Sequence, residues 1–455
     1  MQIHNDIIAA ISTPAGSGAI AVIRVSGSGC IELVNKTFSG KNLQEQATHT
    51  LHFGNIIDEE KKIDEVVVGI FRNPKSYTGE DLVEISCHGS NYIQQQILHL
   101  LLKHGVRQAK AGEFTLRAFL NGKLDLASAE AVADLIAADS ESSHQLAMQQ
   151  MRGGFSNHIK QLRSELIKFA SLIELELDFS EEDVEFANRK QLNDLLSKLH
   201  KAVSGLAESF RLGNVLKLGV NTVIAGRPNA GKSTLLNALL NEERAIVSEI
   251  PGTTRDTIEE TLNIRGVIFR LTDTAGLRDT HDAIEKIGVE RTHEKLQLAA
   301  VVIYLFDIAT MSEEEVKKEI DSLKLNDVPI ILAANKSDLL SDEELKKKFS
   351  SLQNLIFISA KKSERIHELK EKIFSSVMNG KTQGGIVVSN IRHYDALMKT
   401  LSAIDDVMIS LNNHASGEMY SLDIRRALDY LGEITGEITN EDLLDSIFRD
   451  FCIGK

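Results

Sequence analysis

Gly226-Arg227-Pro228-Asn229-Ala230-Gly231-Lys232-Ser233 is the stretch on which the interpretation of this sequence depends. It has the pattern of a phosphate-binding loop, a glycine followed by four residues and then Gly-Lys-Ser. Residues 220–225 before it are typical of a buried strand, and residues 234–240 after it are typical of a helix. In that context, backbone N–H groups and the positive end of the helix hold phosphate oxygens. The sequence therefore predicts a nucleotide site, with Lys232 at the outer phosphates and the Ser233 hydroxyl on magnesium.

The composition is that of an ordinary globular protein. The chain has 455 residues, of which 42% are apolar and 25% are charged, and this length suggests about three domains. Its net charge of −14 argues against a surface generally coated with nucleic acid. Any contact with RNA must therefore come from a local basic patch or from a partner protein.

No segment of the sequence indicates export or insertion into a membrane. Residues 1–6 lack the basic start and long apolar core of a secretory signal. The longest apolar run, residues 299–306, is too short to cross a membrane. Three cysteines, Cys30, Cys87 and Cys452, are too widely spaced for a zinc site or a disulfide framework. We therefore expect a cytoplasmic protein with reduced cysteines.

Residues 1–120 are predicted to form an α+β domain. Short apolar segments bounded by turn residues indicate strands, and one longer segment indicates a helix. The expected strands are residues 18–27, 65–71 and 82–86, and the expected helix is residues 93–104. In the third strand, Glu84 and Ser86 are expected on the face opposite Val83 and Ile85, because side chains alternate along a strand.

Residues 121–212 and 381–455 are predicted to form one all-α domain. Alanine and leucine recur at helical spacing in both segments, and such helices need partners to cover their apolar stripes. Residues 213–380 alternate strands with helices, as in the doubly wound sheet of an α/β domain. Residues 257–272 are expected to form a hairpin about Arg265-Gly266. The simplest arrangement inserts the α/β domain into the helical domain.

Two motifs after the loop are typical of the phosphate side of a GTPase. Gly252-Thr253-Thr254-Arg255-Asp256 lies where a switch segment belongs, and Thr254 is expected to give magnesium a second hydroxyl. Asp273-Thr274-Ala275-Gly276 ends a strand. There Asp273 can hold magnesium through water, and the Gly276 N–H can sense the γ-phosphate.

Two later motifs are typical of guanine recognition. Asn335-Lys336-Ser337-Asp338 follows the apolar strand at residues 330–333. The Asp338 carboxylate can accept two hydrogen bonds from guanine, and adenine lacks that pair of donors. Ser359-Ala360-Lys361 supplies a backbone N–H for the base carbonyl. Each motif is weak alone, but five in this order and spacing predict a Ras-like P-loop GTPase domain.

Leu277 follows Asp-Thr-Ala-Gly, where many signalling GTPases have a glutamine that orients the attacking water. A leucine side chain cannot orient water, so other groups must do so and must offset the phosphate charge. The Asn229 amide oxygen is a candidate for holding a monovalent cation against the phosphates. Residues 278–285 are a candidate for orienting the water, although their pattern alone favours a solvated loop.

Five further motifs, combined with the helical blocks and the GTPase set, closely resemble the MnmE/TrmE family of tRNA-modifying GTPases over essentially the whole chain. They are residues 13–18, 77–81, 111–115, 121–126 and 451–455. Ala111 stands where the family usually has a proline, which is a small departure outside the catalytic residues.

The resemblance implies a potassium-activated GTPase whose G domains approach one another. It implies that Glu285 orients the attacking water and that Lys232 serves catalysis. Magnesium would be held by Ser233 and Thr254, and potassium by Asn229, Ser248, Ile250 and Thr253. The full set of expected GTP contacts is Asn229, Ala230, Gly231, Lys232, Ser233, Thr234, Ser248, Glu249, Ile250, Pro251, Gly252, Thr253, Thr254, Asp273, Thr274, Ala275, Gly276, Asn335, Lys336, Asp338, Ser359, Ala360 and Lys361.

The resemblance also implies that the N-terminal domain binds a tetrahydrofolate derivative, either the 5-formyl or the methylene form, and mediates a homodimer. The folate contacts would be Arg24, Glu84, Lys123 and Lys455. By pattern alone, Arg24 and Glu84 would be solvated surface residues. The family ends in Cys-x-Gly-Lys, so this end of the chain should reach the folate pocket. The corresponding hypothesis is that the Cys452 thiol takes a direct part in tRNA modification.

The function implied by the resemblance is modification of the wobble uridine of certain tRNAs, coupled to GTP hydrolysis. With the FAD-containing partner MnmG/GidA, the protein would add an aminomethyl or carboxymethylaminomethyl group at C5. One alternative is a ribosome-assembly GTPase that binds RNA without base chemistry, which would carry a basic RNA-binding domain. Another is a folate-dependent one-carbon transferase for a small metabolite, which would leave the GTPase motifs unexplained.

Overall fold

The computed structural model describes residues 6–178, 189–241, 260–273, 299–323, 328–378, 385–413, 417–449 and 451–455. The chain divides into two compact units. The first unit comprises Met1–Ala137, Ala147–Gly205 and Asp395–Lys455, and the second comprises Ala138–Leu146 and Leu206–Tyr394.

A six-stranded sheet forms the centre of the second unit, with strand order β13-β12-β11-β8-β10-β9. The strands are β8 (Val220–Ala225), β9 (Glu260–Ile264), β10 (Val267–Asp273), β11 (Val301–Asp307), β12 (Ile330–Asn335) and β13 (Leu355–Phe357). All pairings are parallel except that of β9 with β10. The predicted hairpin is therefore confirmed from Glu260 onward, with Arg265 and Gly266 both at positive φ in its turn. Residues 257–259 of that hairpin lie outside the described residues.

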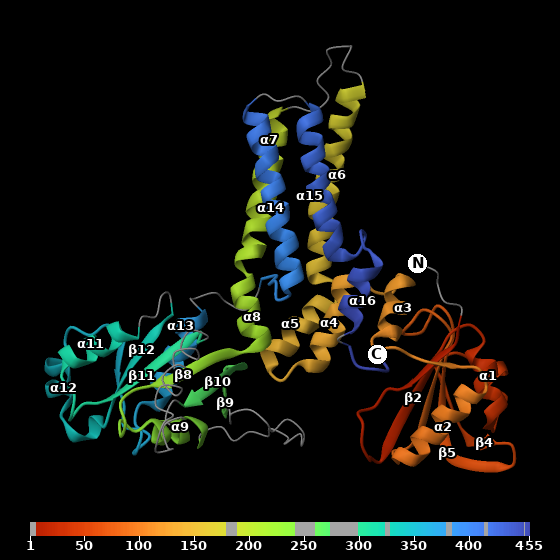
Figure 1. Ribbon diagram of the computed structural model, residues 1–455, viewed down its shortest axis with the longest axis horizontal. Coiled ribbons are helices and arrows are strands. Elements are labelled where there is room, and N and C mark those ends of the chain that lie inside the picture. Colours follow the sequence, from red (N-terminus) through yellow and green to blue (C-terminus); the bar gives the residue numbers. More distant parts are fainter. Residues whose placement is uncertain are drawn as a thin grey trace, which may run out of the picture. The chain divides into compact units, whose positions relative to one another are not determined.

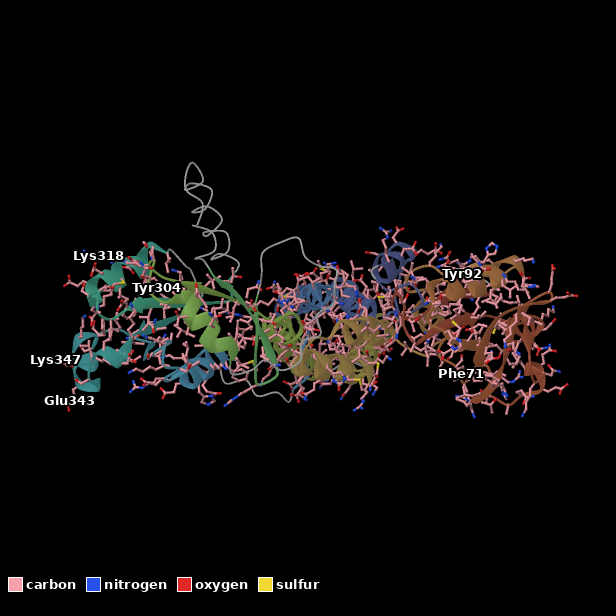
Figure 2. All side chains as sticks on the ribbon, turned by 90° about the horizontal axis from the view of Figure 1, so that it is seen from below. Phe71, Tyr92, Tyr304, Lys318, Glu343 and Lys347 are labelled. Atoms are coloured by element: carbon pink, nitrogen blue, oxygen red, sulfur yellow. The ribbon has the colours of Figure 1, made fainter. Side chains whose placement is uncertain are left out.

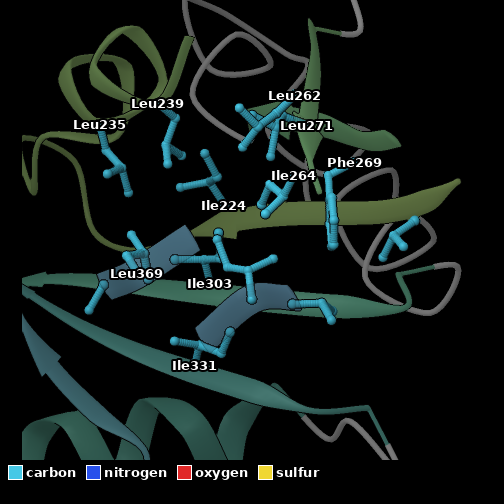
Figure 3. Close-up of a cluster of buried hydrophobic side chains, with 14 of the residues drawn as sticks. Ile224, Leu235, Leu239, Leu262, Ile264, Phe269, Leu271, Ile303, Ile331 and Leu369 are labelled. Carbon is cyan, nitrogen blue, oxygen red and sulfur yellow. The ribbon is translucent and has the colours of Figure 1, made fainter. Parts of the chain in front are cut away.

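Helices cover both faces of this sheet. They are α8 (Phe210–Leu218), α9 (Lys232–Asn241), α11 (Glu313–Ser322), α12 (Asp342–Lys348) and α13 (Ile366–Met378), with a short 3₁₀ helix, η4, at Ser337–Leu339. One core cluster includes Ile224, Leu235, Phe269, Ile303 and Leu369 (Figure 3).

A second core cluster fills the other face, where Tyr304 and Phe306 pack with Val316 of α11 and Leu345 of α12. Every residue of β11 is buried, as predicted for a strand at the centre of a parallel sheet. Lys318, Glu343 and Lys347 lie on the outer surface of α11 and α12 (Figure 2), so each helix turns its apolar stripe to the sheet.

The first unit contains a seven-stranded sheet with order β3-β4-β5-β6-β2-β1-β7. The strands are β1 (Ile8–Ile11), β2 (Ile20–Ser26), β3 (Phe38–Ser39), β4 (Thr50–Asp58), β5 (Lys61–Phe71), β6 (Leu82–His88) and β7 (Arg107–Gln108). Helices α1 (Cys30–Thr37) and α2 (Asn91–Lys103) share a core cluster with one face of it, and α3 (Glu113–Leu120) follows β7. A 3₁₀ helix, η1 (Leu43–Glu45), precedes β4. Burial of Val83 and Ile85 confirms the predicted alternation in β6.

Long helices complete the first unit. They are α4 (Leu126–Ala137), α5 (Glu141–Met151), α6 (Gly154–Asp178), α7 (Arg189–Glu208), α14 (Ile391–Asn412), α15 (Gly417–Thr435) and α16 (Glu441–Arg449). Parts of α5, α7 and α14 belong to the second unit. Helix α6 packs along α15 (Figure 1). Its predicted apolar stripe is buried and comprises Ile159, Leu162, Leu166, Phe169 and Ile173.

The second unit is inserted in sequence between α7 and most of α14. An inserted α/β unit was the arrangement predicted from the sequence. The residue boundaries at 120, 212 and 380 stay predictions. Among the helices that the structure describes, none combines the length and apolar character needed to span a membrane.

We predict that adjacent valines of β5 differ in their effect on stability. Val68 is 0% exposed and Val67 is 36% exposed, on opposite faces of the sheet. Val68→Ala removes two buried methyl groups and should lower the free energy of unfolding by about 2 kcal/mol. Val67→Ala is the matched control and should cost less than about 1 kcal/mol. Urea unfolding of the full chain measures both, and equal losses would contradict the assignment of faces.

Candidate functional site

The phosphate-binding loop connects β8 to α9 at the carboxyl edge of the sheet. Gly226 has a φ of +148°, and a Cβ there would lie 2.0 Å from the carbonyl oxygen of Leu305 in β11. Gly231 has a φ of +99°, and a Cβ there would lie 2.4 Å from Nδ2 of Asn335. Both positions therefore require glycine, because the loop runs directly against its neighbours.

Lys232 begins α9 and is only 7% exposed. Its Nζ donates to the carbonyl oxygens of Gly226 and Arg227, both at 3.0 Å. The ammonium charge is thus held within the loop, at the N-terminal end of a helix, where anions are favoured. Ser233 and Thr234, in the same first turn, are exposed, so their hydroxyls can reach a ligand outside the loop.

Asn335 ties the base side of the site to the phosphate side. Its Nδ2 donates to the Ala230 carbonyl at 2.8 Å, and its Oδ1 accepts from the Ala360 N–H at 3.0 Å. The side chain is 3% exposed. Three predicted motifs, the loop, Asn335–Asp338 and Ser359–Lys361, therefore meet at one buried amide.

Asp338 lies in η4, where its Oδ1 accepts a hydrogen bond from the Ser359 hydroxyl at 2.8 Å. That hydrogen bond, together with Lys362 Nζ at 3.4 Å, holds the pKa of Asp338 below its ordinary value. The group is therefore a carboxylate at neutral pH, which is the form that accepts hydrogen bonds from guanine.

Two contacts around the loop were missed by the sequence interpretation. Lys336 Nζ lies 2.6 Å from Oδ2 of Asp307, a buried carboxylate at the end of β11. Arg227 of the loop forms ion pairs with Glu315 and Glu319 of α11. The Asp307 contact had a usable signal, because Asp307 ends an apolar strand just as Asp273 does. The Arg227 contacts had none, because they join residues about 90 positions apart.

The remaining predicted nucleotide residues are only partly placed. Asp273 ends β10, and its backbone pairs in register with Ile224 of β8 beside the loop. The predicted contacts Ser248, Glu249, Ile250, Pro251, Gly252, Thr253, Thr254, Thr274, Ala275, Gly276 and Glu285 lie outside the described residues, as does Leu277.

The side chains around the loop fit a magnesium ion that is bound mainly by the phosphate oxygens of GTP. Among the described residues, no three His, Cys, Asp or Glu side chains gather as a metal cluster. A magnesium ion bound to GTP needs instead a hydroxyl and phosphate oxygens, and Ser233 supplies such a hydroxyl. Asn229 is exposed at a φ of +63° within the loop, so its amide is available to a cation at the phosphates.

A second cluster of predicted residues lies on the sheet of the first unit. Arg24 of β2 pairs in register with Glu84 of β6, and its Nε and Nη2 donate to Glu84 Oε1 at 3.1 and 2.8 Å. Glu84 Oε2 accepts no hydrogen bond within the described part of the chain. The Arg24 guanidinium lies 5.2 Å from the ring centroid of Tyr77 and 5.7 Å from that of Phe114. The sequence pattern alone predicts that Arg24 and Glu84 are solvated. In the structure they form a partly buried ion pair beside two aromatic rings.

The C-terminal residues reach this cluster. The Gly454 carbonyl accepts from Arg24 Nη1 at 3.3 Å and from the Ser12 hydroxyl at 3.1 Å. The Phe114 N–H donates to the Lys455 carbonyl at 3.2 Å, and the Gly112 N–H donates to the Cys452 carbonyl at 3.4 Å. The predicted approach of the chain end to Arg24 and Glu84 is therefore observed.

Two other predicted residues lie near this cluster. Cys452 is exposed and carries a free thiol. Lys123 donates from Nζ to the Pro74 carbonyl at 3.1 Å. Its neighbour Asn121 donates to the Thr78 carbonyl at 2.8 Å, next to Tyr77. Lys123 is thus connected to Arg24 through the segment that holds Tyr77.

Comparison with known proteins agrees with this geometry. Residues 7–123 match the model for the GTP-binding protein TrmE N-terminus, and residues 126–452 match the MnmE helical domain. A relative from Christiangramia forsetii, named tRNA modification GTPase MnmE, is 55% identical over 99% of both chains. Relatives with the same name from Cytophaga hutchinsonii and Flavobacterium johnsoniae are 53% and 54% identical over at least 98% of each chain.

The chain belongs to the MnmE family of tRNA modification GTPases. Both matched family models and the full-length relatives support this assignment. Among solved structures, Aquifex aeolicus Era bound to GDP and AlF4⁻ aligns over 42% of this chain and 67% of its own, with 28% identity. The TM-score of this alignment is 0.28. Family membership and the phosphate-binding loop together make this protein a GTP-binding GTPase.

We predict that Asp338→Asn changes which base is bound. The amide nitrogen cannot accept from guanine, so GTP affinity should fall about 10- to 100-fold. Xanthosine triphosphate, which has an oxygen in place of the exocyclic amine, should bind the variant better than GTP. Fluorescence titration with both nucleotides measures the exchange. Glu343→Gln, an exposed carboxylate on α12, is the control and should keep the preference for GTP. Equal losses for both nucleotides in Asp338→Asn would contradict the assigned role.

Proposed function

We propose that this MnmE-family GTPase uses GTP hydrolysis to drive modification of the wobble uridine of certain tRNAs at C5. The product would carry an aminomethyl or carboxymethylaminomethyl group, made together with an FAD-containing MnmG/GidA partner. The more general part of this function is a GTPase that acts in tRNA modification, and it is supported by relatives of that name that are similar over the full chain. The position on the base and the partner are the proposal.

In the second unit, we assign the hydrolytic residues as follows. Lys232 holds charge at the outer phosphates, and Asp338 selects guanine. Asn229 binds potassium beside the phosphates, with Ser248, Ile250 and Thr253 as its other ligands. Ser233 and Thr254 bind magnesium, and Glu285 orients the water. The exposed Asn229 amide and the exposed Ser233 hydroxyl support the two roles that fall on described residues.

In the first unit, we assign the cluster around Arg24 and Glu84 to a tetrahydrofolate derivative. Glu84 Oε2 remains available to accept from the amino-pyrimidine edge of a pterin, and Tyr77 and Phe114 offer apolar ring surface beside it. When bound, the folate would supply the one-carbon unit. The protein's part is to hold the pterin at Glu84 and to close the site with Lys123 and the residues 452–455. A direct role of Cys452 belongs to this proposal.

We further propose that the protein is a homodimer and acts in the cytoplasm, where its tRNA substrate is available. Leu51 and Phe53 of β4 are 73% and 68% exposed, and Val67 of β5 lies beside them on the same face. Neighbouring apolar side chains on an open sheet face are suited to burial against a second subunit.

A ribosome-assembly GTPase is the remaining alternative from the sequence. It predicts a basic RNA-binding domain beside the GTPase unit. The described first unit instead has a sheet with α1 and α2 on one face and long helices, in a chain of net charge −14. No observation favours a folate-dependent transferase without the GTPase.

We predict that GTP turnover is about tenfold or more faster in potassium than in sodium, because a cation of the right size offsets charge that develops on the phosphates. Asn229→Ala should abolish the difference between the two salts. Asn237→Ala, the same change at an exposed position of α9, should preserve it. Steady-state phosphate release measures the rates. Equal turnover of the wild type in sodium and potassium would remove the potassium role of Asn229.

We predict that a strain lacking this gene loses the modified wobble uridines from a subset of its tRNAs. Mass analysis of digested tRNA detects the missing C5 groups. Re-expression of the chain should restore them, which controls for indirect effects of the deletion. If the deletion strain retained its full set of modified wobble nucleosides, the proposed function would fail.

A further inference from the structure

A cavity of about 460 Å³ lies in the first unit beside Lys123. The turn before α4, the start of α6 and the end of α15 line it. Its size falls within the range of ordinary small-molecule sites. Its charged lining residues are Lys123, Asp125, Arg152, Lys160 and Glu437.

Both acids of this cavity are already neutralised. Asp125 accepts from Lys160 Nζ at 2.9 Å and from the Ser156 hydroxyl at 2.9 Å. Burial alone would raise the pKa of Asp125, but hydrogen bonds from Lys160, Ser128 and Ser156 hold it below its ordinary value. Glu437 forms an ion pair with Arg163, which lies outside the lining. Neither carboxylate therefore offsets a further cation in the wall.

Two cations remain in surplus. The Lys123 ammonium donates to a neutral partner, the Pro74 carbonyl. Arg152 is exposed and forms no ion pair within the described part of the chain. In a chain with a net charge of −14, the wall of this cavity therefore carries a local surplus of positive charge, which favours anions.

The cavity and the proposed folate site share one residue, Lys123. Lys123 is one of the residues assigned to folate, and it belongs to the cavity wall. A chain of contacts leads back from it, through Asn121 and Thr78, to Tyr77 and the Arg24 guanidinium. If Glu84 holds the pterin, Lys123 is the assigned cation that can meet the carboxylated end of the ligand, and Lys123 also lines the cavity.

We propose that this cavity binds the γ-linked glutamate chain of a polyglutamylated folate, an inference that rests on the proposed folate site. Each added glutamate brings one carboxylate. Lys123 and Arg152 would receive two of them, so the gain in affinity should level off after about two additional glutamates. Exposed ion pairs are weak, so the total gain should be roughly 3- to 20-fold. It should shrink at high salt, because such pairs are screened.

The test is calorimetric titration of the full-length protein with 5-formyltetrahydrofolate that carries one, three or five glutamates. We expect the triglutamate to bind roughly 3- to 20-fold more tightly than the monoglutamate, and the pentaglutamate to add little more. Raising the salt to about 0.5 M should bring the affinities together. These measurements on the wild type need no variant to fold.

Two matched variants locate the effect. Arg152→Glu should bring the ratio of monoglutamate to triglutamate dissociation constants close to one. Lys168→Glu makes the same charge reversal at an exposed position of α6 outside the cavity, and should keep the wild-type ratio. Thermal unfolding of both variants verifies that they are folded.

Three outcomes would overturn the proposal. If the monoglutamate binds but added glutamates change nothing, the cavity does not hold the tail, although the folate site stands. If no folate binds at all, the proposed folate site fails and takes this inference with it. If Arg152→Glu weakens tRNA binding while the folate ratio stays at its wild-type value, the cavity belongs to RNA phosphate.

Discussion

The close approach of the phosphate-binding loop to β11 is the constraint on which the nucleotide site depends. A side chain at Gly226 would meet the Leu305 carbonyl at 2.0 Å, so only a glycine lets β8 turn there without displacing its neighbour. Because β8 sits between β10 and β11, that turn fixes the loop against the sheet. Asn335, at the end of β12, then locks the loop to the base-binding segment through Ala230 and Ala360. The segments that bind phosphate and base are therefore fixed to each other at the carboxyl edge of the sheet, where α/β sheets bind ligands.

The site on the first unit is assembled on a different physical basis. Its central ion pair depends on the antiparallel register of β2 and β6, which sets Arg24 opposite Glu84. The last residues of the chain are then held mainly by backbone hydrogen bonds and one close approach, since a Cβ at Gly454 would lie 2.6 Å from the Ile11 carbonyl. The end of the chain is thereby part of a site whose other residues come from the first 123 positions.

The sequence predicts the second unit better than the first, because the site of the second unit depends more on local patterns. The loop, the Asn335–Asp338 segment and β11 are local patterns, in which consecutive residues determine the geometry. Arg24 and Glu84 are 60 positions apart, and their pairing follows from strand register that no local pattern encodes. Strand β4 was missed because Leu51 and Phe53 make its open face apolar, which hides the alternation expected of a half-buried strand. Two-residue strands such as β3 and β7 have no period to detect.

An insertion as large as the second unit is compatible with a packed helical first unit because its two ends are joined. Phe210, where the chain enters, stacks on Tyr394, where it leaves, with ring centroids 4.5 Å apart. The Val388 N–H donates to the Ser209 hydroxyl at 3.0 Å, and Gly213 leaves no room for a side chain against the Val388 carbonyl. The entry and the exit of the inserted segment therefore lie side by side. The core of each unit can then form without straining the other, as with other inserted domains whose termini lie close together.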